Sequence, residues 1–145
     1  MKEDNIKILF DTNVIIDAFT KRENYDVASS NLFFRALRNE INGFVATKQI
    51  TDIYYILRRY ITDKDKRKEL INIIIESLYL IDLNKEYIWA SKDYQGIDFE
   101  DNVLLTIAYN EKMDYLVTNN KKHFVNNKVK IVTPSELEII LNKTN

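Results

Sequence analysis

Short apolar runs alternate with longer amphipathic stretches along the chain. Five runs have the length and composition of β-strands and cover residues 6–10, 43–46, 79–83, 115–117 and 129–132. Six longer stretches have the character of helices and cover residues 25–39, 48–60, 64–78, 85–90, 100–111 and 135–141. In the fifth of these, Leu104, Leu105 and Ala108 recur at helical spacing. The pattern predicts strands that alternate with helices.

This alternation indicates the fold class. Strands separated by helices of about a dozen residues are joined by crossover connections and pair in parallel. We therefore predict an α/β fold of three layers, α/β/α, in which helices cover both faces of a five-stranded parallel sheet. The chain has 145 residues, of which 46% are apolar, and only two glycines and one proline, so no linker is evident. Residues 1–145 are predicted to form a single domain.

Ligands of such folds bind beyond the carboxyl ends of the strands, near a switch in strand order. Polar residues gather at those ends here. Asp11-Thr12-Asn13 follows the first predicted strand, Thr118-Asn119-Asn120 follows the fourth, and the helix after the second strand carries Asp52. Asp98 and Asp101, three residues apart, would lie on one side of the first turn of the helix 100–111. These side chains are candidates for one shared site.

Each carboxylate also has a purely structural interpretation. Asp98 or Asp101 could cap the helix that follows, and Asp11 could form a turn. Asp52 lies off the apolar stripe of its helix, so periodicity alone allows it to be solvated. Only the whole constellation favours a functional role for all four.

Several carboxylates at one sheet edge would repel one another unless a cation sat among them. Oxygen ligands select Mg²⁺ or Mn²⁺, and a chain with no cysteine and one histidine has little with which to build a zinc or copper site. The net charge of −1 provides no global positive field, so any nucleic-acid contact would be local. The absence of an apolar run of roughly 20 residues leads us to expect a soluble, cytoplasmic protein that does not enter the membrane.

Four segments in this order resemble PIN-domain proteins. They are Leu9-Phe10-Asp11-Thr12-Asn13-Val14-Ile15-Ile16-Asp17, Thr51-Asp52-Ile53-Tyr54-Tyr55-Ile56-Leu57, Asp98-Phe99-Glu100-Asp101-Asn102-Val103-Leu104-Leu105 and Leu116-Val117-Thr118-Asn119-Asn120-Lys121-Lys122-His123-Phe124. The closing Val132-Thr133-Pro134-Ser135-Glu136-Leu137 also agrees. Many members of the family are VapC-like toxins of bacterial toxin-antitoxin pairs that cut RNA. The resemblance therefore implies metal-dependent hydrolysis of RNA, an antitoxin partner and the option of a homodimer.

By the same resemblance, Asp11, Asp52 and Asp101 fall on the catalytic, metal-binding acids, and Asp98 is an accessory metal ligand. Asn13, Thr118 and Asn119 would support them. Two positions depart from the family pattern: Asp52 is shorter than the more usual glutamate, and the fourth acid falls on the neutral Asn120. A missing charge at Asn120 would weaken a second metal site. It also favours the alternative that the chain is a catalytically weakened PIN-like module that binds RNA or protein.

Other functions fit the sequence less well. A receiver domain would need a phosphoacceptor after the third strand, for which Asp82 is the only candidate, and an aspartate-dependent phosphatase would need an acid at Asn13. The two glycines exclude a P-loop and a dinucleotide fingerprint. His123, Arg58-Arg59 and the basic run 64–68 are more typical of a solvated surface, whereas Lys121-Lys122 would lie close to the presumed site. One of Tyr54 and Tyr55 is expected in the core, and we do not assign base stacking to them.

Overall fold

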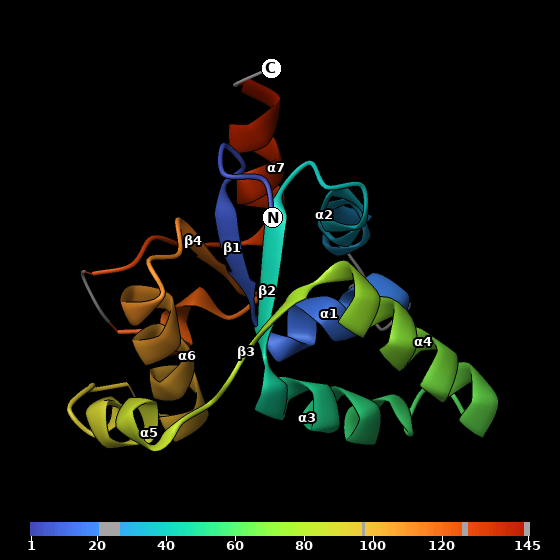
Figure 1. The fold of residues 1–145 in the computed structure, drawn as a ribbon, viewed down its shortest axis with the longest axis horizontal. Coiled ribbons are helices and arrows are strands. Elements are labelled where there is room, and N and C mark those ends of the chain that lie inside the picture. The colour runs from blue at the N-terminus through green and yellow to red at the C-terminus, as the bar shows by residue number, and fades with distance from the viewer. Residues whose placement is uncertain (21–26, 97, 126–127, 144–145) are drawn as a thin grey trace.

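Five parallel strands form the sheet that organises the molecule (Figure 1). The computed structural model describes residues 1–20, 27–96, 98–125 and 128–143. The strands are β1 (Lys7–Phe10), β2 (Asn42–Ala46), β3 (Tyr79–Ile81), β4 (Tyr115–Val117) and β5 (Ile131–Val132), in the order β3-β2-β1-β4-β5. The predicted five-stranded parallel sheet is thus confirmed, although β3 and β5 are shorter than the apolar runs that contain them.

Helices connect these strands. They are α1 (Thr12–Phe19), α2 (Val27–Leu37), α3 (Thr47–Leu57), α4 (Lys64–Ser77), α5 (Lys85–Ser91), α6 (Phe99–Asn110) and α7 (Pro134–Lys143), with a short 3-10 turn, η1 (Lys121–His123), after β4. All six predicted helices are present to within a few residues, and residues 25 and 26 of the first prediction lie outside the described ranges. No helix in the described part of the chain is long and apolar enough to cross a membrane. The single-domain organisation stays a prediction.

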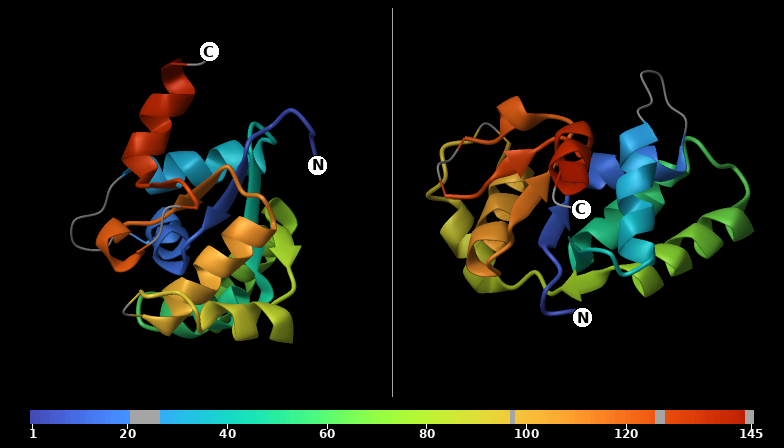
Figure 2. Two further views of the ribbon diagram at one scale, coloured as in Figure 1. Left: turned by 90° about the vertical axis from the view of Figure 1, so that its left-hand side faces the viewer. Right: turned by 90° about the horizontal axis from the view of Figure 1, so that it is seen from above.

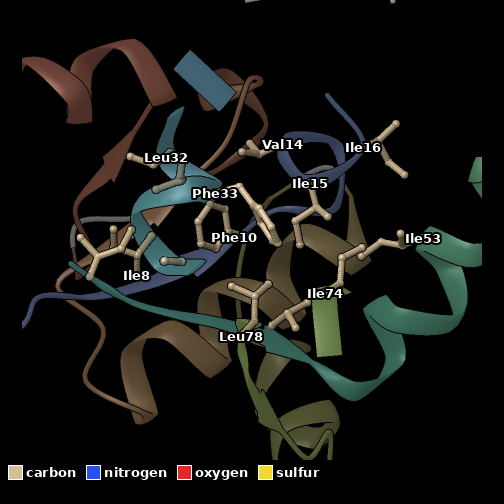
Figure 3. Close-up of a cluster of buried hydrophobic side chains, with 14 of the residues drawn as sticks. Ile8, Phe10, Val14, Ile15, Ile16, Leu32, Phe33, Ile53, Ile74 and Leu78 are labelled. Carbon is tan, nitrogen blue, oxygen red and sulfur yellow. The ribbon is translucent and has the colours of Figure 1, made fainter. Parts of the chain in front are cut away.

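Side chains alternate between the two faces of the sheet and so build two cores. In β1, Ile8 and Phe10 enter a core formed with α1, α2, α3, α4 and α7, while Leu9 points into a second core formed largely with α6. Figure 1 shows α5 and α6 on one side of the sheet and α1, α2 and α4 on the other. Figure 3 shows the first core, in which Phe10 and Phe33 lie among aliphatic side chains. The three-layer prediction is confirmed.

The helix α1 was not predicted. Val14, Ile15 and Ile16 are β-branched, a composition more typical of strands, yet all three are fully buried in the first core. Packing outweighs the weak local preference: Phe19 at the end of α1 meets Phe33 of α2 edge to face, with 4.8 Å between ring centroids. Farther along, α7 lies beside α2 (Figure 2), where Arg35 pairs with Glu138 at 3.1 Å.

The strand order places the polar strand ends together. The chain moves from β1 to β2 and β3 on one side of the sheet, then returns to β4 and β5 on the other. The order therefore switches between β1 and β4, where ligands of open α/β sheets bind. Asp11 follows β1 and Thr118 follows β4, so both stand at this switch point.

Candidate functional site

A cavity of about 580 Å³ opens at the carboxyl edge of the sheet, between the first turns of α3 and α6. Its polar lining comes from the strand ends and these two helices, and it includes Asp11, Asn13, Lys48, Asp52, Asp98, Asp101, Asn120 and His123. The four aspartates singled out in the sequence thus line one cavity. Their role as metal ligands stays a prediction.

Asp11 is the most enclosed of these acids, with only 8% of the residue exposed. Its backbone NH donates to the Val117 carbonyl at 2.9 Å, which extends the pairing of β1 with β4. Its side chain makes no capping hydrogen bond with α1 and instead accepts one from the Thr118 hydroxyl at 2.7 Å. Burial raises the pKa of the Asp11 carboxyl, and the Thr118 hydrogen bond opposes part of that shift. A simple turn-forming role does not explain this placement.

Asp101 lies in the first turn of α6, and its side chain is 13% exposed. Burial and then the charges of Asp11, Asp98 and Glu100 raise the pKa of the Asp101 carboxyl to about 7. The repulsion expected among clustered carboxylates is therefore present in the folded chain. A cation placed among these groups would relieve it.

Asp98 and Asp52 are more exposed and already have partners. Asp98 caps α6 by accepting a hydrogen bond from the Glu100 backbone NH at 2.8 Å, so the capping interpretation is correct for this residue. Asp52 pairs with the ammonium of Lys48 at 2.8 Å. The same ammonium lies 3.5 Å from Glu100 and so links α3 to the start of α6. Sequence reasoning missed Lys48, although its spacing four residues before Asp52 is the usual signal for a helical ion pair.

The supporting residues do not all face the cavity. Thr118 is fully buried, and its hydroxyl oxygen accepts a hydrogen bond from the Asn120 backbone NH at 3.0 Å while it donates to Asp11. Asn13 and Asn120 line the cavity. Asn119 is exposed and donates to Asp17 at 2.6 Å, outside the cavity lining. The side chain of Asn119 therefore does not contact the four aspartates that line the cavity.

Two further residues matter more than the sequence suggested. His123 was regarded as typical of a solvated surface, but its Nδ1 lies 3.7 Å from Asp101 and it lines the cavity. Gln49 is buried; its amide donates to the Phe10 carbonyl at 2.8 Å, and its carbonyl accepts from the Ala46 backbone NH at 2.8 Å. Gln49 thereby ties together the ends of β1 and β2. The contacts of His123 with Asp101 and of Gln49 with Phe10 join distant parts of the chain, so periodicity gives no signal for them.

The side chains that line the cavity offer the oxygen ligands that hard cations prefer. Mg²⁺ and Mn²⁺ are such cations, and the oxygen atoms come from Asp11, Asp52, Asp98, Asp101 and Asn120. Within the described ranges, no three acidic or histidine side chains are placed so that they could bind one metal ion together. Mg²⁺ commonly binds through one or two carboxylates and keeps several waters, so a site here would need no more than two of these acids.

Comparisons with known proteins agree with this fold. The family model of the PIN domain matches residues 7–122. Ribonuclease VapC1 of Aquifex aeolicus (strain VF5) is 27% identical over 139 residues, which cover 90% of this chain and 92% of that protein.

Solved structures resemble the chain in fold. VapBC2 from Rickettsia felis, bound to a DNA fragment from its promoter, has a TM-score of 0.62 at 17% identity and covers 86% of this chain and 96% of its own. FitAB bound to the IR36 DNA fragment has a TM-score of 0.63 at 16% identity, with 88% and 94% covered. VapC20 from Mycobacterium tuberculosis, described as a toxin that cleaves the sarcin-ricin loop, has a TM-score of 0.57 at 8% identity, with 75% and 86% covered.

The raised pKa of Asp101 predicts a measurable effect on stability without metal. The carboxyl titrates near 4 in the unfolded chain and at about 7 in the folded one, so the folded state holds the extra proton between these values. Stability should fall as pH rises through that window, and Asp101→Asn should remove this part of the slope. At pH 8 the variant should be more stable by on the order of 2 kcal/mol after allowance for solvent screening.

The free energy of unfolding is measured by urea titration from pH 4 to 8 in EDTA. Asp82→Asn, at an exposed position, is the matched control. Parallel pH profiles for wild type and Asp101→Asn would contradict it.

Proposed function

The chain belongs to the PIN domain family, and on this premise we propose that it is a metal-dependent endoribonuclease that hydrolyses RNA phosphodiester bonds. One observation carries the proposal: a buried aspartate, Asp11, stands at the switch point of the sheet in the same cavity as Asp101, whose pKa is raised by burial and then by the charge of Asp11. Such a pair is costly to fold and suited to a cation. The similarity to Ribonuclease VapC1 of Aquifex aeolicus supports RNA as the substrate class.

Asp11 and Asp101 would hold a divalent cation, Mg²⁺ or Mn²⁺, with Asp52, Asp98 and Asn120 as further oxygen donors. When bound, such an ion supplies a water of lowered pKa and neutralises charge on the phosphate. The hydrogen bond from Thr118 fixes the orientation of the Asp11 carboxylate. Asp52 would first have to leave the ammonium of Lys48, which is then free to contact a phosphate.

We further propose that the protein acts as the toxin of a toxin-antitoxin pair, in the cytoplasm. The fold of the chain resembles VapBC2 and FitAB along nearly its whole length, and VapC20 is described as a toxin that cleaves the sarcin-ricin loop. An antitoxin protein would then be a partner in addition to RNA. Co-expression with an adjacent reading frame, followed by copurification, tests this part of the proposal.

A second candidate function is binding without cleavage. Asn120 supplies no charge to the cavity, and Lys48 already occupies Asp52. A module of this kind would bind RNA or protein and would hold Mn²⁺ poorly, so calorimetric titration with Mn²⁺ separates it from the nuclease.

Replacing the buried acids should abolish cleavage while the fold is kept. We expect Asp11→Asn and Asp101→Asn each to lower the rate of Mn²⁺-dependent cleavage of single-stranded RNA by about 100-fold or more, because each removes a proposed ligand. Asp82→Asn, an exposed aspartate just after β3 and outside the cavity lining, should cleave like wild type. Undiminished cleavage by Asp11→Asn protein of native circular dichroism would assign the chemistry to other residues.

Asn120→Asp should strengthen metal binding. One added charge near a dication is worth on the order of 1 kcal/mol at an effective dielectric constant of 20 or above. We therefore expect a second ion to bind more tightly and cleavage at low Mn²⁺ to rise by about tenfold. Asn119→Asp is the matched control, because this side chain contacts Asp17 outside the cavity and should give no such gain. Equal metal affinity and equal rates for Asn120→Asp and wild type would exclude position 120 from the metal shell.

A further inference from the structure

The cavity that holds the aspartates has a second, apolar wall. Two aromatic rings stand on it, Tyr55 of α3 and Phe99 of α6, and they are 62% and 51% exposed. Rings of this size are usually packed into a core, and exposure of two of them beside a carboxylate cluster suggests contact with a ligand. Ile88 of α5 lines the same wall. The cavity therefore combines a charged half with an aromatic half.

The backbone couples these rings to the acids. Tyr55 follows Asp52 by three residues on α3, so the two side chains are neighbours on the helix surface, about 4.5 Å apart along its axis. Phe99 is the first residue of α6 and lies between Asp98 and Asp101 in sequence. A phosphate held at the aspartates would thus have the rings within reach of its own nucleotide.

We propose that Tyr55 and Phe99 form a subsite that stacks an unpaired nucleobase of the RNA next to the phosphate to be cut. This inference rests on the proposed ribonuclease function and names the residues that would hold one base of the single-stranded substrate. Every base has a face that can stack on an aromatic ring, and that face is inaccessible inside a base-paired helix.

Arg58 supports this assignment. Its guanidinium lies over one face of the Tyr55 ring, 5.8 Å from the centroid, so a base would stack on the opposite face with a positive charge close by. RNA approaching four aspartates needs such charges along its backbone. Asp52, Tyr55 and Arg58 follow one another at intervals of three residues. A carboxylate, an aromatic ring and a cation therefore lie one after another along α3 and its C-terminal cap.

Trp89 provides an internal control. It is the most exposed large aromatic residue described, at 71%, and packs against Lys92, but it does not line the cavity. An effect that depends on the cavity should therefore appear on substitution of Tyr55 or Phe99 and not of Trp89.

The test measures binding of short fluorescent RNAs by anisotropy in Mn²⁺, with Asp11→Asn as a common background that does not cut. The probes are a single-stranded oligomer, the same oligomer with one abasic position moved along it, and a hairpin that pairs the sequence. We expect Tyr55→Leu and Phe99→Leu to weaken binding of the intact strand by about tenfold, since stacking contributes strongly per base. Trp89→Leu should bind like the parent, and Tyr55→Phe should bind more tightly than Tyr55→Leu because it keeps the aromatic ring.

The abasic probe makes the result specific. When the missing base is the one that stacks, the parent should bind the abasic probe as weakly as the ring variants bind the intact strand. The ring variants should bind this abasic probe and the intact strand with equal affinity. Equal losses by the ring variants on every probe, no loss on any, or a hairpin bound as tightly as the single strand would overturn the inference. The inference would also be overturned if the protein sediments as a dimer and Phe99→Leu converts it to a monomer. A second copy of the chain would then cover the aromatic wall.

Failure of the subsite can be told from failure of the ribonuclease. If wild type cuts single-stranded RNA while the ring variants bind every probe normally, only the subsite is wrong. If wild type neither cuts nor binds RNA, the proposed function fails and the subsite with it.

Discussion

The burial of a carboxylate at the end of the central strand is the constraint on which the site depends. Asp11 loses most of its contact with water because β1 is flanked by β2 and β4, and the charge of Asp11 is felt by Asp101 across the cavity. The hydroxyl of Thr118 offsets part of this cost but cannot neutralise the charge. A fold that keeps such a pair is less stable than one without it, which is expected where a site is built for a charged ligand.

Lys48 balances part of the negative charge around the cavity. Its ammonium bridges Asp52 and Glu100 and so balances two of the outer acids, whereas it makes no ion pair with the inner acids Asp11 and Asp101. An exposed pair of this kind contributes little to stability, so it can open at little cost. In the proposed function, the cavity would hold one dication strongly and a second more weakly near Asn120, and the aromatic wall would hold the uncharged part of a nucleotide beside them.

The sheet and most helices could be predicted because apolar residues recur with clear periods. The helix α1 could not, since Val14, Ile15 and Ile16 have a local preference that tertiary packing overrides. Asp11 was found because a carboxylate directly after an apolar run has little local reason to be there, and Asp98 proved to cap α6 as well as line the cavity. The contacts of Lys48 with Glu100, of Gln49 with Phe10 and of His123 with Asp101 join segments far apart in sequence, which no local pattern reveals. Asn119 instead contacts Asp17, another partner far away in the sequence, and its supporting role stays a prediction.

The most direct measurement is a crystal structure of the wild-type protein soaked in Mn²⁺, with the ion located by its anomalous scattering. A metal-dependent nuclease built on this cavity predicts a peak about 2 Å from carboxylate oxygens of both Asp11 and Asp101, with Lys48 displaced from Asp52. A cavity without a peak at millimolar Mn²⁺, or a peak bound only to acids outside it, would contradict the assignment of this cluster as the catalytic centre.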